Sequence, residues 1–441
     1  MNLTENQLEI GGQDSLSQAG TPTIVPACPS IPIDGRDWRD IREDLISMKR
    51  DDFDWRAGRL SIYVYFDNDE LLRVSRDAYD LYFSENALGK RAFPSLARME
   101  NDVLRMCLSL FKAPAGASGS FTSGGTESIF LAMKTARDCY RSRHGPGIRT
   151  NAIVPMTAHP AFDKAAQYLD VDVTRIPVGS DLRCDVASMR EAINERTALI
   201  AGSAPCYPFG VFDPIAGLAS LAAERNVWLH VDACLGGFIA PFARDEGWPI
   251  PEFDFSIPGV TSLSADLHKF GFAARGASVV LYRTPELHAH QAFQFDSWPR
   301  GSYATTTFLG SRPGGSIASA WAVMQYLGQT GYRRIARTTM ETKHRLVRGI
   351  EGIAGLAVVR PSELNIAVYT SVDRSLNINA VADALGGKGW FVGRSKNPEG
   401  IHVAVNPVHA AITGQYLEDL TQACDEVGAL GTIGKYENNS Y

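Results

Sequence analysis

Short apolar runs and amphipathic stretches alternate through the middle of the chain. Apolar runs rich in β-branched residues predict strands, whereas apolar positions spaced three and four residues apart predict helices. Strands are predicted at 151–157, 170–178, 197–203, 227–233, 259–266 and 276–283, and helices at 126–143, 160–169, 186–193 and 214–226. Strands that alternate with helices are typical of a mostly parallel sheet covered by helices, so we expect an α/β fold.

Three regions follow one another along the chain. Residues 1–60 are predicted to form an N-terminal arm and extension, because the first half of this region is rich in Gly, Ser, Thr and Pro. From Trp38 to about Leu110 the pattern is helical, interrupted by an extended piece at 59–68. The alternating pattern occupies the predicted large α/β domain, residues 61–312. A long helical run then leads into strand-like and helical segments, which predict a smaller α+β domain over 313–441.

Composition narrows the function classes. The chain has 441 residues and a net charge of −6, so it lacks the basic excess of nucleic-acid-binding proteins. Its seven cysteines show no CxxC spacing, which favours reduced thiols in a cytoplasmic protein and argues against a structural metal. The N-terminal residues lack the pattern of a signal peptide, and no window approaches the ~18 apolar residues of a membrane helix. We therefore expect a soluble protein without a membrane span.

The segment TSGGTES, residues 122–128, stands directly before a predicted helix. Paired glycines allow a ligand to approach the backbone, and a helix N-terminus with nearby hydroxyls suits a phosphate. The paired glycines and the hydroxyls of Thr126 and Ser128 are therefore candidate phosphate contacts. A glycine turn followed by a capped helix explains the same residues equally well. The spacing matches neither of the common nucleotide-binding glycine motifs, so a nucleotide is not indicated.

Asp232 and His159 are candidate ring contacts. Asp232 ends an apolar strand, at the edge where parallel sheets bind ligands. A carboxylate that faces a pyridine nitrogen keeps it protonated and makes the ring an electron sink. His159 precedes a predicted helix, and an imidazole can lie flat on such a ring and transfer protons. A turn-capping aspartate and a structural histidine are the alternatives.

Lys269 lies in SADLHKFGF, residues 264–272, between two strands that are predicted to be buried. Burying a charged lysine is costly, so a protein that keeps one there often uses its amine as a nucleophile that forms a Schiff base. The later segment 301–315, with Tyr303 and Arg312, predicts either a second anion-binding edge or a domain connection. A phosphate loop, a histidine, an aspartate and a lysine, in this order, supply the elements of a pyridoxal phosphate site.

Several of these runs resemble the sphingosine phosphate lyase family. FTSGGTESIFLAMKTARD, AHPAFDKAA, HVDACLGGF, SADLHKFGFAARGAS and GSRPGG are similar to that family over about residues 60–320, and the similarity continues more loosely to the C-terminus. The aspartate and lysine motifs are shared with related amino-acid decarboxylases, whereas HVDACLGGF and YATTTFLGSRPGG are more particular to the lyases. The resemblance implies a pyridoxal 5'-phosphate enzyme of the aspartate aminotransferase fold, fold type I, that works as a homodimer with shared active sites.

The resemblance also implies roles for the residues that match the family's motifs. Lys269 would hold the cofactor as a Schiff base, Asp232 would pair with the ring nitrogen and His159 would stack on the ring. The implied reaction breaks the Cα–Cβ bond of a β-hydroxy amine and leaves an aldehyde and a primary amine. Lys269 or His159 would transfer the protons. The candidate substrate is sphingosine 1-phosphate or a related phosphorylated long-chain base.

Further residues are assigned by the same resemblance. Gly125, Thr126 and His268 would bind the cofactor phosphate, helped by Gly314 and Gly315 from a partner subunit. Further implied contacts are Ser203 for the cofactor, Arg275 for a substrate phosphate, Tyr65 at a neighbouring subunit's site and Tyr303 in the same cavity.

Departures from the family's pattern keep other readings open. Gly89 stands where the family has a histidine, Arg275 stands where it has a lysine, and Ala204, Cys206 and Phe209 replace polar residues. An amino-acid decarboxylase or a related carbon–carbon lyase with a smaller substrate is the main alternative. A cofactor-binding protein without catalytic activity is the third reading, which the joint presence of a lysine, an aspartate and a histidine disfavours.

Overall fold

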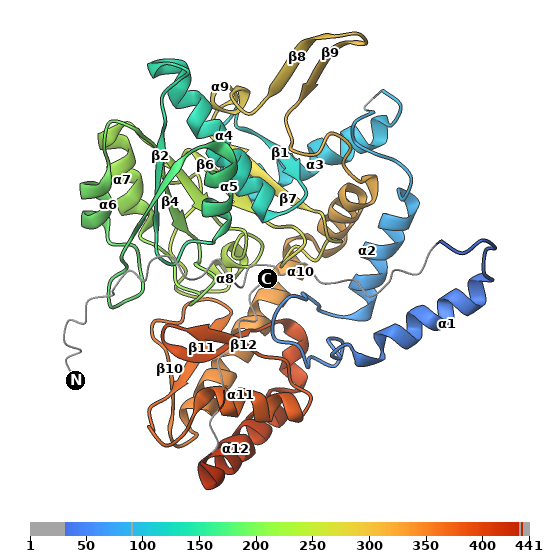
Figure 1. Cartoon of the computed structure of the whole chain (residues 1–441), viewed down its shortest axis with the longest axis vertical. Helices are drawn as coiled ribbons and strands as arrows, with labels where there is room; N and C mark the ends of the chain where they lie inside the picture. The colour runs from blue at the N-terminus through green and yellow to red at the C-terminus, as the bar shows by residue number, and fades with distance from the viewer. Residues whose placement is uncertain (1–30, 90, 432–433, 435–441) are drawn as a thin grey trace. The chain divides into compact units, whose positions relative to one another are not determined.

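A computed structural model describes residues 31–89, 91–431 and 434 of the chain (Figure 1). The chain divides into two compact units, Met1–Asp52 and Phe53–Tyr441. In the first unit, helix α1 spans Trp38–Met48 and a 3-10 turn, η2, spans Lys49–Asp51. The side chain of Asp37 caps α1 by accepting a hydrogen bond from the Arg39 N–H. The arm predicted for residues 1–30 lies outside the described residues.

A seven-stranded sheet forms the centre of the second unit. Its strands are β1 Ser118–Thr122, β2 Asn151–Pro155, β3 Asp172–Ile176, β4 Thr197–Ser203, β5 Trp228–Asp232, β6 Ser262–Ala265 and β7 Ser278–Tyr282, in the order β1-β7-β6-β5-β4-β2-β3. Strand β7 pairs antiparallel with both β1 and β6, whereas the other pairs in this sheet are parallel. The prediction of a mostly parallel sheet is confirmed.

Helices cover both faces of this sheet (Figure 1). Before and between its strands lie α2 Asp69–Leu81, α3 Pro94–Leu110, α4 Gly125–His144, α5 Ala161–Leu169, α6 Val186–Ala192, α7 Ile215–Arg225 and α8 Ala240–Asp245, and α9 Pro285–Ala289 follows β7. Apolar residues of α4 and α5 pack in one core with one face of the sheet, and those of α3, α7 and α8 pack in another core with the opposite face.

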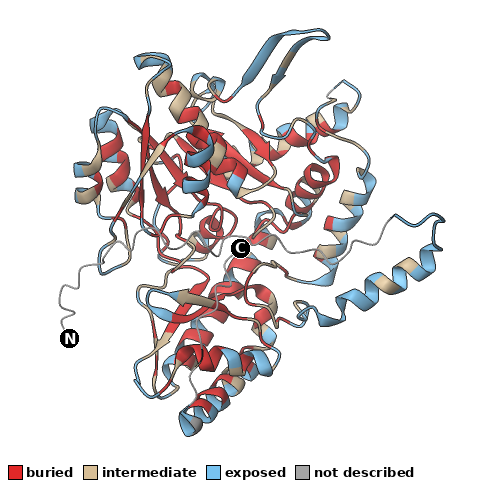
Figure 2. Cartoon of the chain, viewed as in Figure 1, coloured by how far each residue is buried: buried red, intermediate tan, exposed pale blue. Residues whose placement is uncertain are grey.

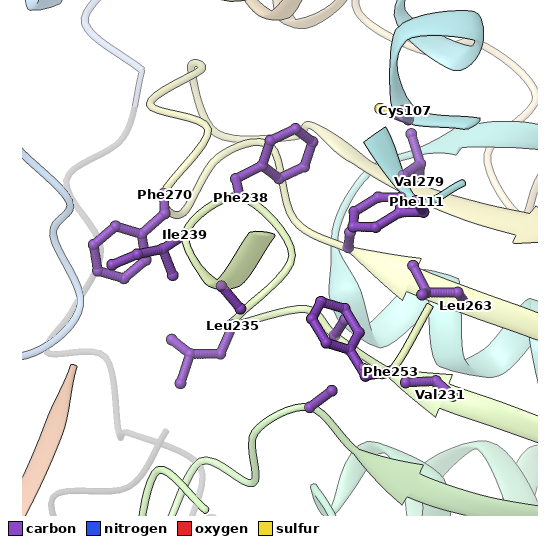
Figure 3. Close-up of a cluster of buried hydrophobic side chains, with 14 of the residues drawn as sticks. Cys107, Phe111, Val231, Leu235, Phe238, Ile239, Phe253, Leu263, Phe270 and Val279 are labelled. Carbon is purple, nitrogen blue, oxygen red and sulfur yellow. The ribbon is translucent and has the colours of Figure 1, made fainter. Parts of the chain in front are cut away.

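The two faces follow from the alternation of side chains along each strand. Val231, Leu263 and Val279 point into the same core as Phe111 and Phe253 (Figure 3). Each of these five side chains is fully buried, and burial of one large apolar side chain stabilises the fold by about 1.5–3 kcal/mol. Figure 2 shows the strands of the sheet as the most continuously buried part of the chain.

A smaller antiparallel sheet follows α10, Gly314–Glu351. Its strand order is β10-β11-β13-β12, with β10 Leu356–Val358, β11 Ile366–Ser371, β12 Gly393–Lys396 and β13 Glu399–Ala404. Along the chain, α11 Ile378–Gly387 lies between β11 and β12, and η3 Pro407–Ala411 and α12 Thr413–Leu430 follow β13. The apolar residues of this part form a core of their own. The backbone at Gly328 interrupts α10 with a φ of 52°. The residues on both sides of position 312 belong to one compact unit, Phe53–Tyr441. The domain boundary at 312/313 stays a prediction.

Two local features differ from the expectation. The extended piece expected at 59–68 forms no named strand and makes one bridge, between Leu60 and Phe391. Strands β8, Phe293–Trp298, and β9, Gly301–Thr305, form an antiparallel hairpin that was not predicted from the sequence. Phe293 and Phe295 alternate with Gln294 and Asp296, as in a strand, but every residue of β8 is exposed (Figure 2). None of the described helices has the length and hydropathy to cross a membrane.

Arg312 forms a buried ion pair. Its guanidinium donates hydrogen bonds to the two carboxylate oxygens of Glu100, at 2.6 and 3.2 Å, and to the carbonyl oxygen of Phe121 at 3.1 Å. Arg312 is 7% exposed and Glu100 8%. The sequence allowed two interpretations of the segment that contains Arg312: a second anion-binding edge or a connection between domains. The structure favours the connection, because the charge of Arg312 is neutralised within the fold.

Removing one partner of this pair should destabilise the protein strongly. The change Glu100→Ala leaves a buried arginine without its carboxylate, and we expect a loss of about 3–5 kcal/mol in the free energy of unfolding. The control Arg333→Ala breaks the exposed pair with Asp245 and should cost no more than about 1 kcal/mol. Urea unfolding followed by circular dichroism at one protein concentration measures both. Equal losses would show that the Arg312–Glu100 pair has no special role.

Candidate active site

A cavity of about 930 Å³ opens where four strands of the large sheet end. β1, β4, β5 and β6 are mutually parallel in direction, so their carboxyl ends meet at one edge of the sheet, which is where open α/β sheets bind ligands. The structure brings together at this cavity nine of the residues proposed from the sequence, namely Tyr65, Gly125, Thr126, His159, Ser203, Asp232, His268, Lys269 and Arg275.

Lys269 stands on a tight turn directly after β6. The turn is closed by backbone hydrogen bonds from Lys269 N–H to the Asp266 carbonyl oxygen at 3.3 Å and from Phe272 N–H to the Lys269 carbonyl oxygen at 3.0 Å. A Cβ atom on Gly271 would lie 2.4 Å from the Leu267 carbonyl oxygen, so this position of the turn requires glycine. The turn thus presents the lysine amine at the floor of the cavity.

The amine of Lys269 pairs with the carboxylate of Asp266. Nζ lies 3.1 Å from Asp266 Oδ2, and His268 Nε2 lies 3.6 Å from the same oxygen. Asp266 is 2% exposed. Burial opposes ionisation of this carboxyl group, but the charges of Lys269 and His268 outweigh burial and lower the pKa of Asp266 below its usual value. The floor of the cavity therefore holds a carboxylate and an amine in direct contact.

Asp232 ends β5 and reaches the cavity beside Ser203, its partner in the register of β4. One carboxylate oxygen of Asp232, Oδ1, accepts hydrogen bonds from the Cys234 N–H at 3.0 Å and from the Ser264 hydroxyl at 3.4 Å. These bonds hold the carboxylate in one orientation. The Ser203 N–H donates to Asp213 at 2.7 Å, and burial raises the pKa of Asp213 to about 6.

His159 precedes α5 on the opposite wall of the cavity. Its Nδ1 accepts a hydrogen bond from the Ala161 N–H at 3.1 Å, so in a neutral ring the proton resides on Nε2. Burial lowers the pKa of His159, and the neighbouring charges of Asp232 and Lys269 act in opposite directions. The imidazole is therefore mainly neutral near pH 7, which suits flat contact with an aromatic ring.

The mouth of the cavity carries aromatic and cationic side chains. Tyr63 and Tyr65 come from the segment before α2, and Arg275 and Lys164 bring positive charge. Arg275 donates a hydrogen bond to the carbonyl oxygen of Tyr63, and its guanidinium carbon lies 5.9 Å from the centre of the Tyr65 ring. Tyr63 has a φ of 69°, a strained conformation for a residue with a side chain. Arg275 therefore helps to hold the strained segment at the mouth.

Three predicted residues lie away from this chain's own cavity. Tyr303 belongs to β9 and packs against Phe293 and Trp298 in the hairpin. Gly314 and Gly315 begin α10, where a Cβ atom would lie 2.7 Å from the Glu85 carbonyl oxygen or from the Tyr79 ring. Their assignment to a partner's site stays a prediction. Tyr65, which the resemblance assigns to a neighbouring subunit's site, lines the cavity of its own chain.

Of the residues that depart from the family's pattern, Arg275 lines the cavity, whereas Gly89, Ala204, Cys206 and Phe209 lie outside its wall. Cys206 and Phe209 are buried in the core of the large sheet, at 1% and 8% exposure, and Ala204 is fully buried. Gly89 precedes α3 in a turn in which its carbonyl oxygen accepts from the N–H groups of Ala92 and Phe93. The substitutions to Cys206 and Phe209 therefore change packing behind the cavity, whereas Ser203 and Tyr207 line it.

Comparison with known proteins connects this geometry to a family. The model of the pyridoxal-dependent decarboxylase conserved domain matches residues 72–367. A sphingosine-1-phosphate lyase of Oryza sativa subsp. japonica is 39% identical over 424 residues, which cover 94% of this chain and 78% of that protein. The corresponding enzyme of Saccharomyces cerevisiae is 34% identical over 93% of this chain and 69% of its own length. This chain belongs to the pyridoxal-dependent decarboxylase family, among its sphingosine-1-phosphate lyase-like members.

Solved structures agree with this assignment. A sphingosine-1-phosphate lyase of Burkholderia pseudomallei superposes with a TM-score of 0.87 at 34% identity, covering 92% of this chain and 95% of that chain. A glutamate decarboxylase of Lactobacillus brevis has a TM-score of 0.81 at 21% identity, covering 94% of this chain and 97% of that chain, and shows the shared fold alone. The enzyme is thus a pyridoxal-phosphate-dependent lyase with the fold of the group II decarboxylases, and these expectations from the sequence are confirmed.

The residues around the cavity fit pyridoxal phosphate. A Cβ atom on Gly125 would lie 2.9 Å from Asp266 Oδ2 and from Cys234 Sγ, and one on Gly124 would lie 3.3 Å from His268. The glycines therefore keep open the space before the first turn of α4, whose N–H groups lack partners within the helix. Nearby stand an amine, a carboxylate and an imidazole. Within the described residues, no group of three or more His, Cys, Asp or Glu could hold a metal ion.

Two residues with a role in this enzyme's site were missed from the sequence. Asp266 could have been noticed, because a second charged residue stands three positions before Lys269 in a segment that is otherwise apolar and small. Glu127 gave no such signal. Its carboxylate accepts hydrogen bonds from the Ser123 N–H and hydroxyl, both at 2.6 Å, and from the Phe308 N–H at 2.7 Å. It ties the glycine loop to the segment after the hairpin.

Replacing Lys269 should abolish covalent attachment of the cofactor. After incubation with pyridoxal phosphate and reduction with borohydride, the wild-type protein should carry a pyridoxyl group on the peptide that contains Lys269. Lys269→Ala should carry none there, and Lys112→Ala, which changes an exposed lysine paired with Glu252, should be labelled like the wild type. Peptide mass spectrometry measures all three. A label on another lysine in the wild type would overturn the assignment.

Proposed function

We propose that this enzyme cleaves the Cα–Cβ bond of a phosphorylated long-chain β-hydroxy amine, with sphingosine 1-phosphate or a close relative as substrate. The products are a long-chain aldehyde and phosphoethanolamine. The observation that carries the proposal is the cavity that gathers Lys269, Asp232 and His159 in a chain 39% identical to a sphingosine-1-phosphate lyase. An activity on an amine is supported by the pairing of the lysine amine with a buried carboxylate.

The central residues share the binding of the cofactor. Lys269 would hold it covalently, Asp232 would pair with the ring nitrogen and His159 would stack on the ring. Gly125, Thr126 and His268 would bind its phosphate, and Ser203 would contact the cofactor. When bound, pyridoxal phosphate supplies an electron-accepting ring that stabilises the negative charge left on a substrate carbon when a bond to it breaks.

The proton transfers fall to residues at the cavity floor and wall. Cleavage requires removal of the proton from the β-hydroxyl group and return of a proton to Cα, so that an aldehyde and an amine result. Lys269, released when substrate binds, and His159, whose Nε2 carries the proton of the neutral ring, are the candidates. Asp266 lies 3.1 Å from Lys269 Nζ and stabilises the charged form of the amine.

Two cations favour a substrate that carries phosphate. Arg275 and Lys164 both line the cavity, and both are exposed, so they can meet an anionic group at the mouth. A guanidinium binds a phosphate with two parallel hydrogen bonds, which a lysine cannot do. A decarboxylase acting on a smaller amine is the second candidate, favoured by Gly89, which stands where the lyase family has a histidine.

We infer that two copies of the chain form a homodimer with shared active sites, in the cytoplasm. The β8–β9 hairpin supports the dimer, since Phe293, Phe295 and Trp298 are 55%, 49% and 46% exposed on one chain. Exposed aromatic clusters of this kind usually mark an interaction surface. The cytoplasm suits the six cysteines within the described part of the chain, none of which forms a disulfide bond.

The substrate proposal predicts two defined products. Enzyme loaded with pyridoxal phosphate and incubated with dihydrosphingosine phosphate should release a fatty aldehyde and phosphoethanolamine in equal amounts, detected by mass spectrometry. Lys269→Ala should release neither. If the wild type retains the lysine-bound cofactor and forms neither product, the lyase proposal is wrong. Release of carbon dioxide from an amino acid would then identify the decarboxylase.

A matched variant tests recognition of the substrate phosphate. Arg275→Gln should raise KM for the phosphorylated amine about tenfold, because charge-assisted hydrogen bonds to phosphate are lost. KM for the same amine without phosphate should stay within about twofold. An equal rise for both substrates would mean that Arg275 holds the mouth in shape and does not bind phosphate.

The dimer proposal predicts a concentration-dependent response to changes in the hairpin. Sedimentation should show the wild type as a dimer, and the double change Phe295→Ser with Trp298→Ser should shift it toward monomer, with a parallel loss of activity. The control Val372→Ser removes an exposed apolar side chain elsewhere and should leave the dimer intact. A fully active wild-type monomer would refute the shared site.

A further inference from the structure

A ladder of buried polar side chains leads through the sheet to Asp232. Trp228, His230 and Asp232 alternate along β5 and share one face, and β6 places Ser262 beside His230 and Ser264 beside Asp232 in parallel register. All five residues are buried: His230, Ser262 and Ser264 are fully buried, Trp228 is 7% exposed and Asp232 is 8% exposed. Trp228 packs in the core that α4 and α5 form with this face of the sheet, and Asp232 lines the cavity at the other end of the ladder.

Hydrogen bonds join the members of the ladder in sequence. Trp228 Nε1 lies 2.7 Å from Ser262 Oγ, and Ser262 Oγ lies 2.8 Å from His230 Nδ1. His230 Nε2 lies 3.2 Å from Ser264 Oγ, which lies 3.4 Å from Asp232 Oδ1. The Cys234 thiol donates to Ser264 Oγ at 3.3 Å. An unbroken path therefore connects the indole to the carboxylate.

The direction of every bond follows from the two ends of the path. Indole N–H can only donate and a carboxylate can only accept. Ser262 therefore receives the indole hydrogen and gives its own to His230 Nδ1, which leaves the imidazole proton on Nε2. That proton points to Ser264, whose hydroxyl hydrogen points to Asp232. All the donors are aligned toward the carboxylate, and aligned hydrogen bonds polarise one another.

We propose that the path Trp228–Ser262–His230–Ser264 positions Asp232 and keeps the proton on the ring nitrogen of the bound cofactor. The proposal rests on the role of Asp232 in the proposed function. The Ser264 hydroxyl and the Cys234 N–H bond Oδ1, at 3.4 and 3.0 Å, and would leave Oδ2 to pair with the ring nitrogen. A carboxylate held in that place favours the protonated nitrogen, which makes the ring a better electron acceptor.

His230 can do this because it remains uncharged. Burial lowers the pKa of His230 to about 4, although Asp232 opposes the shift. The Phe162 ring of α5 packs against the imidazole with a distance of 6.1 Å between ring centres, and Ser262 and Ser264 occupy the two ring nitrogens. The Ser264 hydroxyl has a single hydrogen and gives it to Asp232, so His230 Nε2 is the donor to Ser264 and the neutral ring carries its proton there. The four residues act through Asp232 and are positioning residues.

The test measures the protonation of the cofactor ring directly. Protein loaded with pyridoxal phosphate labelled with ¹⁵N in the ring gives a nitrogen chemical shift that reports whether the nitrogen is protonated. Ser264→Ala removes the member of the path that donates to Asp232, and Trp228→Phe removes the indole donor at its far end. Both should move the nitrogen signal toward the unprotonated value, Ser264→Ala by more, and lower kcat about tenfold with KM little changed.

A matched control separates this role from loss of a buried hydroxyl. Ser75→Ala makes the same chemical change at a serine that is 4% exposed and bonded to the Ser319 hydroxyl at 2.8 Å. It should leave the nitrogen signal and kcat as in the wild type. The proposal is overturned if the signal of Trp228→Phe matches the wild type, or if Ser75→Ala shifts it equally. The signal needs bound cofactor and no turnover, so it is informative even if the proposed substrate fails.

Discussion

The cost of taking charge out of water shapes the floor of this cavity. A lysine, two aspartates and two histidines lie there with little exposure, and an isolated buried charge would cost several kcal/mol. Each charge is stabilised by a specific partner: Asp266 contacts Lys269 at 3.1 Å, and Asp232 accepts from the Cys234 N–H and the Ser264 hydroxyl. His159 at the cavity, and His230 buried inside the sheet below Asp232, avoid the cost by remaining neutral. The partners therefore decide which groups can ionise.

The direction of the strands places these partners. Because β4, β5 and β6 run parallel, Ser203, Asp232 and the turn that begins at Asp266 reach the same edge of the sheet. Side chains two residues apart on a strand share a face, so the polar residues of β5 and β6 that meet at this edge continue into the interior as the ladder below Asp232. The alternate positions, such as Val231 and Leu263, pack in the opposite core. One register thus builds both the core and the support of the site.

Much of this could be predicted from the sequence, and the rest depends on contacts between distant residues. Alternating apolar runs predicted the parallel sheet, and Lys269, Asp232 and His159 were recognised because each stands at the end of a predicted strand or beside a helix. The pair Arg312–Glu100 joins positions 212 residues apart, so no local pattern reveals it. The β8–β9 hairpin was missed because its apolar–polar alternation, from Phe293 to Asp296, covers only four residues and no core contact accompanies it. The cavity of a chain does not include its own Tyr303, Gly314 and Gly315. The role predicted for them, in the active site of a partner subunit, depends on contacts between two chains.

The mouth of the cavity differs from its floor in what its side chains do. The electron-accepting ring serves lyases and decarboxylases alike, and the bond that breaks is the one the pocket holds perpendicular to the ring. At the mouth, Arg275 bonds the backbone of Tyr63, whose φ is 69°, and lies beside the Tyr65 ring. A guanidinium has five N–H donors, so it can hold Tyr63 and still offer a parallel pair of donors to a phosphate. A lysine carries its three N–H donors on one nitrogen and offers no parallel pair beside a bond to Tyr63. The guanidinium of Arg275 therefore holds the strained segment through one donor and keeps others available at the mouth.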